Sequence, residues 1–146
     1  MGKDDALLKQ YEIMVGTTQN VTTWRQTANT FYLTINTALL SLILYTAQTS
    51  ITGEKIILSA IGIILAVLWF YSIDYYKKLN KAKFDVIWLM EEKLPMQMFK
   101  LEYKGDKEKD KVEGYRGRVK GITVIEKYLP VVFGVAYVIT LVIFFV

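Results

Sequence analysis

The polar side chains best placed to do chemistry inside a membrane lie along the first long apolar block of the sequence. They recur mainly at three- and four-residue intervals, with two asparagines seven residues apart on a neighbouring stripe: Gln26, Asn29, Thr30, Thr34, Asn36, Thr37 and Ser41. Such groups hydrogen-bond between membrane helices for about 1 kcal/mol each. They favour helix–helix contact, because ion pathways usually carry charged residues and none lies within the apolar core of this block. The lining of an aqueous pathway is the alternative.

A second candidate site is basic. Lys77, Lys78, Lys81 and Lys83 directly follow the second apolar block, where anionic lipid headgroups attract a basic side chain by about 1 kcal/mol near the surface. Determination of membrane topology by the same lysines is an equally good interpretation. Nucleic acid is disfavoured as a partner, because residues 103–121 interleave acidic side chains with the lysines and present no uniform positive field.

The sequence offers no catalytic or metal-binding constellation. It contains no cysteine and no histidine, which excludes thiolate nucleophiles, Cys/His zinc sites and His-dependent acid–base catalysis. Glu91 and Glu92 are adjacent, so on a helix their side chains point about 100 degrees apart. A solvated helix end explains this pair better than two catalytic carboxylates. We therefore expect a protein that is not an enzyme and holds no cofactor.

Three apolar blocks position these residues. Each is long enough to cross most of a bilayer as a helix, and 53% of the 146 residues are hydrophobic. We predict transmembrane helices over residues 29–48, 56–73 and 129–146, the third with Pro130 in its first turn, where a missing N–H is tolerated. Residues 49–55 are predicted to form a short external loop.

The distribution of Lys and Arg predicts the orientation of these helices. Residues 1–28 carry three of the 18, residues 48–55 carry one, and residues 74–128 carry fourteen. Because the cytoplasmic side of a membrane protein carries the basic excess, residues 74–128 should be cytoplasmic. An odd number of spans then places the N-terminus inside and the C-terminus outside.

The two cytoplasmic stretches have helical periodicity of their own. Residues 1–28 predict an amphipathic helix and residues 74–102 a basic amphipathic helix that Pro95 interrupts. Packing of their apolar stripes against each other would make a cytoplasmic helical hairpin. The residues of its predicted core are Leu7, Tyr11, Met14, Leu79, Val86 and Met90. Residues 103–121 are charged and contain four glycines, which predicts a flexible linker, and residues 122–128 form a juxtamembrane segment.

Three stretches of the chain together resemble a known family. They are WRQTAN to NTALL in residues 24–40, LNKAKF and MEEKLP in residues 79–95, and TVIEKYLP in residues 123–130. In order and spacing they are similar to the RipA family of small octameric bacterial membrane proteins. The resemblance implies a homo-oligomer, an octamer, in the bacterial cytoplasmic membrane. It also implies a link to envelope and stress adaptation, without an agreed biochemical activity.

These observations predict an all-α membrane protein with three transmembrane helices, the first two extended into a cytoplasmic helical hairpin, assembled as a homo-oligomer. We expect a non-enzymatic membrane scaffold or regulator that contacts lipids, anionic ones among them, and further copies of itself. Because a large part of the chain is predicted to be cytoplasmic, the sequence is also compatible with an unidentified cytosolic partner. An oligomeric channel or pore lined by the polar face of the first transmembrane helix is the alternative, and a lipid-active enzyme ranks third.

Overall fold

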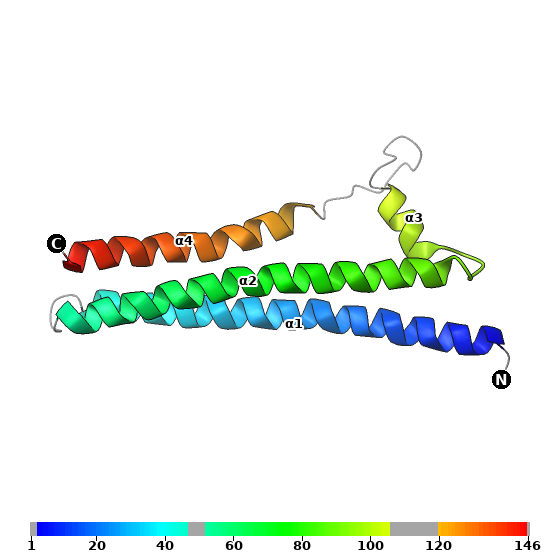
Figure 1. Cartoon of the computed structure of the whole chain (residues 1–146), viewed down its shortest axis with the longest axis horizontal. Helices are drawn as coiled ribbons and strands as arrows, with labels where there is room; N and C mark the ends of the chain where they lie inside the picture. Colours follow the sequence, from blue (N-terminus) through cyan, green and yellow to red (C-terminus); the bar gives the residue numbers. More distant parts are fainter. Residues whose placement is uncertain (1–2, 47–51, 106–119, 146) are drawn as a thin grey trace. The chain divides into compact units, whose positions relative to one another are not determined.

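The computed structural model describes residues 3–46, 52–105 and 120–145 of the chain, and every regular element in these ranges is a helix. The helices are α1 (Lys3–Tyr45), α2 (Thr52–Glu91), α3 (Met98–Gly105) and α4 (Lys120–Phe145), drawn in Figure 1. Three of them, α1, α2 and α4, are long and apolar enough to cross a membrane. The prediction of three apolar spans in a helical chain is therefore confirmed.

The first two helices are much longer than a bilayer requires. α1 has 43 residues and α2 has 40, and at 1.5 Å per residue each is roughly 60 Å long, about twice the thickness of the hydrocarbon core. Both pass without a break through the boundaries predicted near residues 28 and 73. No proline or run of glycines interrupts either helix, so an apolar part and a polar part share one backbone.

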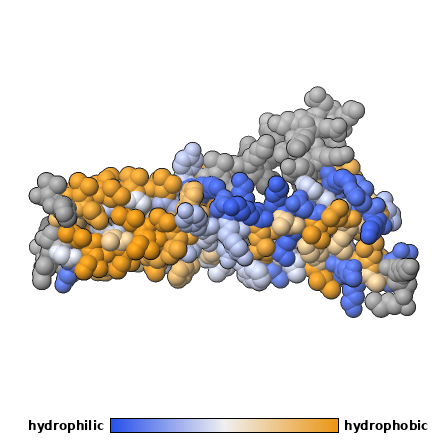
Figure 2. Space-filling model, viewed as in Figure 1, coloured by the Kyte–Doolittle hydropathy of each residue, from blue (hydrophilic) through white to orange (hydrophobic). Residues whose placement is uncertain are grey.

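The chain divides into two compact units, and α1 and α2 contribute to both. The span unit consists of residues 25–75 and 122–146, and the polar unit consists of residues 1–24 and 76–121. In the span unit the buried side chains include Ile43, Ala66, Trp69, Ile73 and Tyr137. The face of this unit that Figure 2 shows is also largely apolar. A unit that is apolar both inside and outside suits a hydrocarbon solvent, because water would strongly oppose so large an exposed apolar surface.

Five of the six residues predicted for the core of the polar unit are partly buried, but the most buried face of α2 is not the predicted one. Val86 was expected in the core of a helical hairpin, but it is 42% exposed, whereas Ile87 and Glu91 are fully buried. The predicted stripe on α2 is therefore rotated by about one residue, roughly 100 degrees, from the buried face. The reason is that polar contacts help to join α1 and α2 in this unit: Lys83 Nζ donates to Thr17 Oγ1 at 3.1 Å. A search for apolar periodicity alone misses such a face.

Two predicted connections differ from the structure. α2 begins at Thr52, so only residues 49–51 of the expected external loop fall outside the described residues. α3 extends to Gly105 and α4 begins at Lys120, so residues 106–119 of the expected linker lie outside the described residues too. Because α4 starts well before residue 129, Pro130 lies inside the helix rather than in its first turn. The expected juxtamembrane segment is the beginning of α4.

Candidate membrane and self-association site

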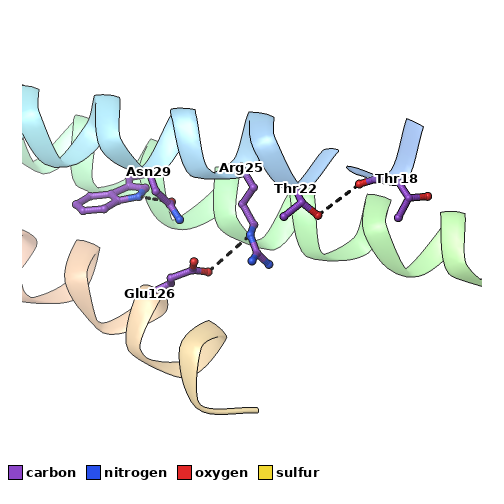
Figure 3. A network of polar contacts seen from close by, with 6 residues as sticks. Thr18, Thr22, Arg25, Asn29 and Glu126 are labelled. Atoms are coloured by element: carbon purple, nitrogen blue, oxygen red, sulfur yellow. Dashed lines mark hydrogen bonds and ion pairs between the residues drawn. The ribbon is translucent and has the colours of Figure 1, made fainter. Parts of the chain in front are cut away.

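An amide–indole hydrogen bond joins α1 to α2 in the span unit. Trp69 of α2 is only 1% exposed, and its Nε1–H donates to Asn29 Oδ1 of α1 at 3.0 Å (Figure 3). The ring of Tyr32 stacks on this indole with the centroids 6.0 Å apart. A buried indole N–H requires an acceptor, so Asn29 serves the interior of the protomer.

The contacts of Tyr137 with Asn36 and Gly62 join α4 to the other two spans, and we call these contacts the tyrosine lock. Tyr137 is fully buried, and its hydroxyl donates to the backbone carbonyl of Asn36 in α1 at 2.8 Å. Its ring lies directly against Gly62 of α2, where a Cβ would overlap three ring atoms. The Asn36 amide itself donates to the Tyr32 carbonyl of α1 at 2.8 Å. Asn36 is thus an interior residue of one protomer.

Further contacts hold α4 along its length. The hydroxyls of Ser59 and Thr140 are 3.2 Å apart, and the ammonium of Lys55 lies 4.8 Å from the centroid of the Phe144 ring. Lys55 was expected in an exposed loop but is only 6% exposed. A cation over an aromatic face, desolvated by burial, stabilises this end of the α2–α4 pair.

Charges at the start of α4 pair with both of the other spans. Glu126 Oε2 lies 3.9 Å from Arg25 Nε of α1 (Figure 3), and Lys127 Nζ lies 3.3 Å from Asp74 Oδ1 of α2. Lys127 also lies over the ring of Phe70, 5.4 Å from its centroid. Because consecutive residues of α4 bind different helices, a shift of α4 along its axis would break both pairs. These ion pairs fix the register of the third span.

The predicted polar stripe on α1 is divided between two faces. Asn29 and Asn36 turn inward, as described above, whereas the remaining members are exposed in the single chain: Gln26, Thr30, Thr34, Thr37 and Ser41. Thr37 Oγ1 donates to the Leu33 carbonyl of its own helix at 2.8 Å. The seven-residue spacing of the asparagines separates them from the threonines by helical geometry. The structure therefore places the hydroxyls and the Gln26 amide on the outside and the two asparagines on the inside.

The outer faces of the other two spans lack such groups. Every exposed side chain of α2 from Ile57 to Leu68 is aliphatic, and so is every exposed side chain of α4 from Leu129 to Ile143. These faces suit contact with lipid acyl chains. Among the described parts of the spans, α1 alone presents a row of hydroxyls outward. We call the exposed residues Thr30, Thr34, Thr37 and Ser41 the hydroxyl row.

The four lysines after the second span do not form one cluster. Lys77, Lys78 and Lys81 are exposed on α2, whereas Lys83 is partly buried and donates to Thr17. All four belong to the polar unit. The first three have the exposure that contact with an anionic headgroup requires, and Lys83 contributes to packing instead.

Glu91 is an interior ligand for backbone and side-chain donors. It is fully buried, and its carboxylate accepts hydrogen bonds from Tyr11 Oη at 3.0 Å, Phe99 N at 2.8 Å and Lys100 N at 3.0 Å. The two backbone donors belong to the first turn of α3, which lacks intrahelical acceptors. Glu91 therefore caps α3 and ties it to α1, and its interpretation as a solvated helix end is wrong. Glu92 is exposed and pairs with Lys100 at 3.1 Å.

The environment of Glu91 also changes the acidity of Tyr11. Burial is the larger cause and the hydrogen bond to the Glu91 carboxylate the second, and together they raise the pKa of Tyr11 to about 12 from its ordinary value of 10. Both causes disfavour a phenolate beside a carboxylate. The Tyr11 phenol therefore keeps its proton and donates it in the structural contact with Glu91.

An apolar groove of about 150 Å³ lies between α1, α2 and α3 in the polar unit. Its lining residues are Val15, Thr18, Gln19, Thr22, Phe84, Ile87 and Phe99. No ionisable side chain lines the groove. In the part of the chain that the structure describes, no group of three or more acidic, cysteine or histidine residues could hold a metal ion.

Sequence reasoning missed the residues that join the three spans. Gly62 and Tyr137 are 75 positions apart, and nothing local to either marks the contact between them. A detectable signal did exist for the ion pairs, because Asp74 follows the second apolar block and the Glu126–Lys127 pair precedes the third. Opposite charges at equivalent borders of neighbouring spans favour such pairing.

Comparison with known proteins supports a membrane assembly. A family model described as "Octameric membrane protein family (8xMP)" matches residues 8–146. No curated protein and no solved structure matches the chain. The family match confirms the resemblance found in the sequence at the level of an octameric membrane protein family, and the RipA name stays a prediction.

Proposed function

Because the chain belongs to the octameric membrane protein family, we propose that it is a non-enzymatic scaffold or regulator that assembles with copies of itself in the bacterial cytoplasmic membrane. The observation that carries this proposal is the hydroxyl row on α1. The exposed faces of α2 and α4 suit lipid, whereas this row has hydrogen-bonding capacity that lipid chains cannot match. A second copy of the chain supplies the matching surface.

The strength of this contact follows from the number of hydroxyls. Interhelical hydrogen bonds in membranes contribute about 0.6–1 kcal/mol each, so four residues contribute about 2–4 kcal/mol for each interface. Small side chains also let helix backbones approach closely, and Ala38 lies among the exposed residues of this face. In a closed ring every protomer has two neighbours. The association energy of the whole ring is therefore the energy of one interface multiplied by the number of interfaces.

The orientation of the assembly rests on charge. Fourteen of the 18 Lys and Arg residues lie in residues 74–128, which favours a cytoplasmic location for the polar unit, the N-terminus inside and the C-terminus outside. The exposed Lys77, Lys78 and Lys81 would then face the anionic headgroups of the inner leaflet. A scaffold of this kind presents its polar unit to cytosolic partners. We propose that it acts in envelope or stress adaptation.

A channel is the competing function, and ring geometry gives it a specific basis. If eight α1 helices met at an axial spacing of 8–10 Å, their axes would lie roughly 10–13 Å from the centre. A helix with its side chains has a radius of about 5–6 Å, so a central opening of roughly 5–8 Å radius would remain. If water filled this opening, the assembly would be a pore. If lipid filled it, the assembly would be a scaffold sealed to ions.

One pair of variants separates these functions. In the first, Thr34, Thr37 and Ser41 are replaced by leucine; in the matched control, Val135, Val138 and Val142 on the lipid-facing surface of α4 are replaced by leucine. We expect the first variant to dissociate by native mass spectrometry and light scattering while the control stays assembled. Reconstituted wild-type protein should pass no ions.

Each other result has a definite meaning. A wild-type protein that is monomeric at all concentrations would contradict self-association. An assembly that conducts ions as wild type and stops conducting as the hydroxyl-row variant would establish the channel instead. Asn36 is unsuitable for this test, because its substitution would disturb the interior contact with Tyr137 rather than the outer surface.

A further inference from the structure

The polar unit carries exposed apolar side chains on one flank of α1. Ile13 is 59% exposed and Trp24 is 56% exposed, and the exposed Asn20 lies between them on the same flank. Their spacings of seven and four residues align them along one side of the helix. We call Ile13, Asn20 and Trp24 the α1 ridge. Ile13 and Trp24 therefore give this flank of α1 two separate apolar side chains that a partner surface can cover.

The apolar groove lies on the other flank of the same helix. Val15 and Thr22 line it, and each stands two residues from a member of the α1 ridge. Two residues on an α-helix correspond to about 200 degrees, so ridge and groove face nearly opposite directions. They also cover the same length of α1, since the groove residues Val15 to Thr22 lie within the span of the ridge from Ile13 to Trp24.

From this arrangement we infer that the α1 ridge of one copy seats in the apolar groove of the next copy around the ring. This inference rests on the proposed self-association and identifies a contact for it. A closed cyclic ring of more than two subunits requires heterologous interfaces, in which two different surfaces meet. Rotation about a symmetry axis parallel to α1 leaves every residue at the same height along that axis. The two surfaces that meet must therefore lie at the same height on their helices. The ridge and groove fulfil both conditions.

Size and chemistry agree with a side chain of a second copy as the occupant. A protein cavity of about 150 Å³ holds a molecule of the size of benzene, and the groove has about this volume, so Ile13 or one ring of Trp24 fits. Phe84 and Phe99 supply apolar walls, and Gln19 on its rim offers an amide near the level of Asn20. The chain's own residues 106–119 are mostly charged or glycine and match the groove poorly.

Cysteine cross-linking tests the contact directly, because the natural chain contains no cysteine. The informative variant carries Asn20→Cys on the ridge and Thr22→Cys on the groove rim. The two thiols point about 200 degrees apart on one helix, so the helix body prevents a link within one chain. In membranes treated with a mild oxidant or a short bifunctional maleimide, we expect a ladder of covalent oligomers from this double variant. Each single variant should stay monomeric on a denaturing gel.

A matched control uses Asn20→Cys with Asp85→Cys. Asp85 is exposed on α2 and lies in the same unit, but it does not line the groove. We expect no ladder from this pair. Dimers from either single variant would show that like surfaces meet, and an equal ladder from the control would show unspecific collision. Either result overturns the inference.

A second measurement keeps the inference testable if the thiols are poorly aligned. Ile13→Gln with Trp24→Gln removes the apolar ridge without touching a buried residue, so each chain should keep its helicity by circular dichroism. Loss of the one apolar side chain that the groove holds should weaken association by roughly tenfold or more. If the double cysteine variant gives no ladder, this measurement decides: unchanged association of the glutamine variant contradicts the ridge contact and leaves the scaffold proposal intact. A wild type that never assembles contradicts both.

Discussion

Replacement of Gly62 by alanine tests whether the tyrosine lock holds the third span in place. The added Cβ would overlap the Tyr137 ring, and the ring cannot swing aside freely because its hydroxyl is bound to the Asn36 carbonyl at 2.8 Å. Overpacking of a filled core costs about 1–3 kcal/mol. Loss of the interhelical hydrogen bond adds about 0.6–1 kcal/mol. We expect a total destabilisation of about 2–4 kcal/mol.

Gly134→Ala is the matched control for this substitution. A Cβ at Gly134 would meet the Ala66 side chain at 3.8 Å, which is an ordinary contact. Alanine is favoured over glycine inside a helix by about 1 kcal/mol, so this variant should be neutral or more stable. Reversible unfolding in mixed detergent, followed by circular dichroism, compares the two. Equal stability of Gly62→Ala and Gly134→Ala would refute the lock, and Tyr137→Phe should lose only the hydrogen-bond part.

Three further predictions concern contacts that join the helices. Because the pKa of Tyr11 is raised to about 12 from 10, the neutral phenol stabilises the folded polar unit below pH 10, and this stabilisation is lost as the pH rises from 10 to 12; Tyr11→Phe should lack that step in the pH dependence of the denaturation midpoint. Lys127→Asp should destabilise the span unit by about 0.5–1 kcal/mol, and a second change, Asp74→Lys, should restore the midpoint if the pair sets the register. Trp69→Phe leaves Asn29 Oδ1 buried without its donor, at a cost of about 1–3 kcal/mol, and an unchanged melting temperature would disprove that contact.

The apolar lengths of the sequence were sufficient to predict the three spans but not the helix ends. Hydrocarbon thickness sets a minimum length for a span and no maximum for the helix that contains it. α1 and α2 continue because nothing in the sequence stops them, and α4 begins about nine residues earlier than predicted, at Lys120. Pro130 was a poor start signal because it is compatible with the interior of a membrane helix whose neighbours satisfy the freed backbone group.

The cores of the two units were harder to predict, for different reasons. In the polar unit the buried face of α2 contains Glu91, which apolar periodicity places outside any core. Its partner Tyr11 is 80 residues away, and no local pattern joins them. In the span unit apolar residues lie on both the buried and the exposed faces, so hydropathy alone does not distinguish the interior from the lipid face. In this unit the polar residues of α1 indicate which face is buried, because their helical spacing separates the asparagines from the threonines.

The division of polar groups on α1 has a physical cause that bears on assembly. A primary amide has two donors and an acceptor, more than one helix can satisfy, so Asn29 is stable in a membrane only beside a fixed partner such as the Trp69 indole. A threonine hydroxyl can donate to the carbonyl four residues earlier in its own helix, as Thr37 does with Leu33. It can therefore face lipid before assembly at little cost and still accept a hydrogen bond from a neighbour afterwards. With Asn29 and Asn36 turned inward and the hydroxyl row turned outward, α1 is suited to associate with a second copy through hydroxyls.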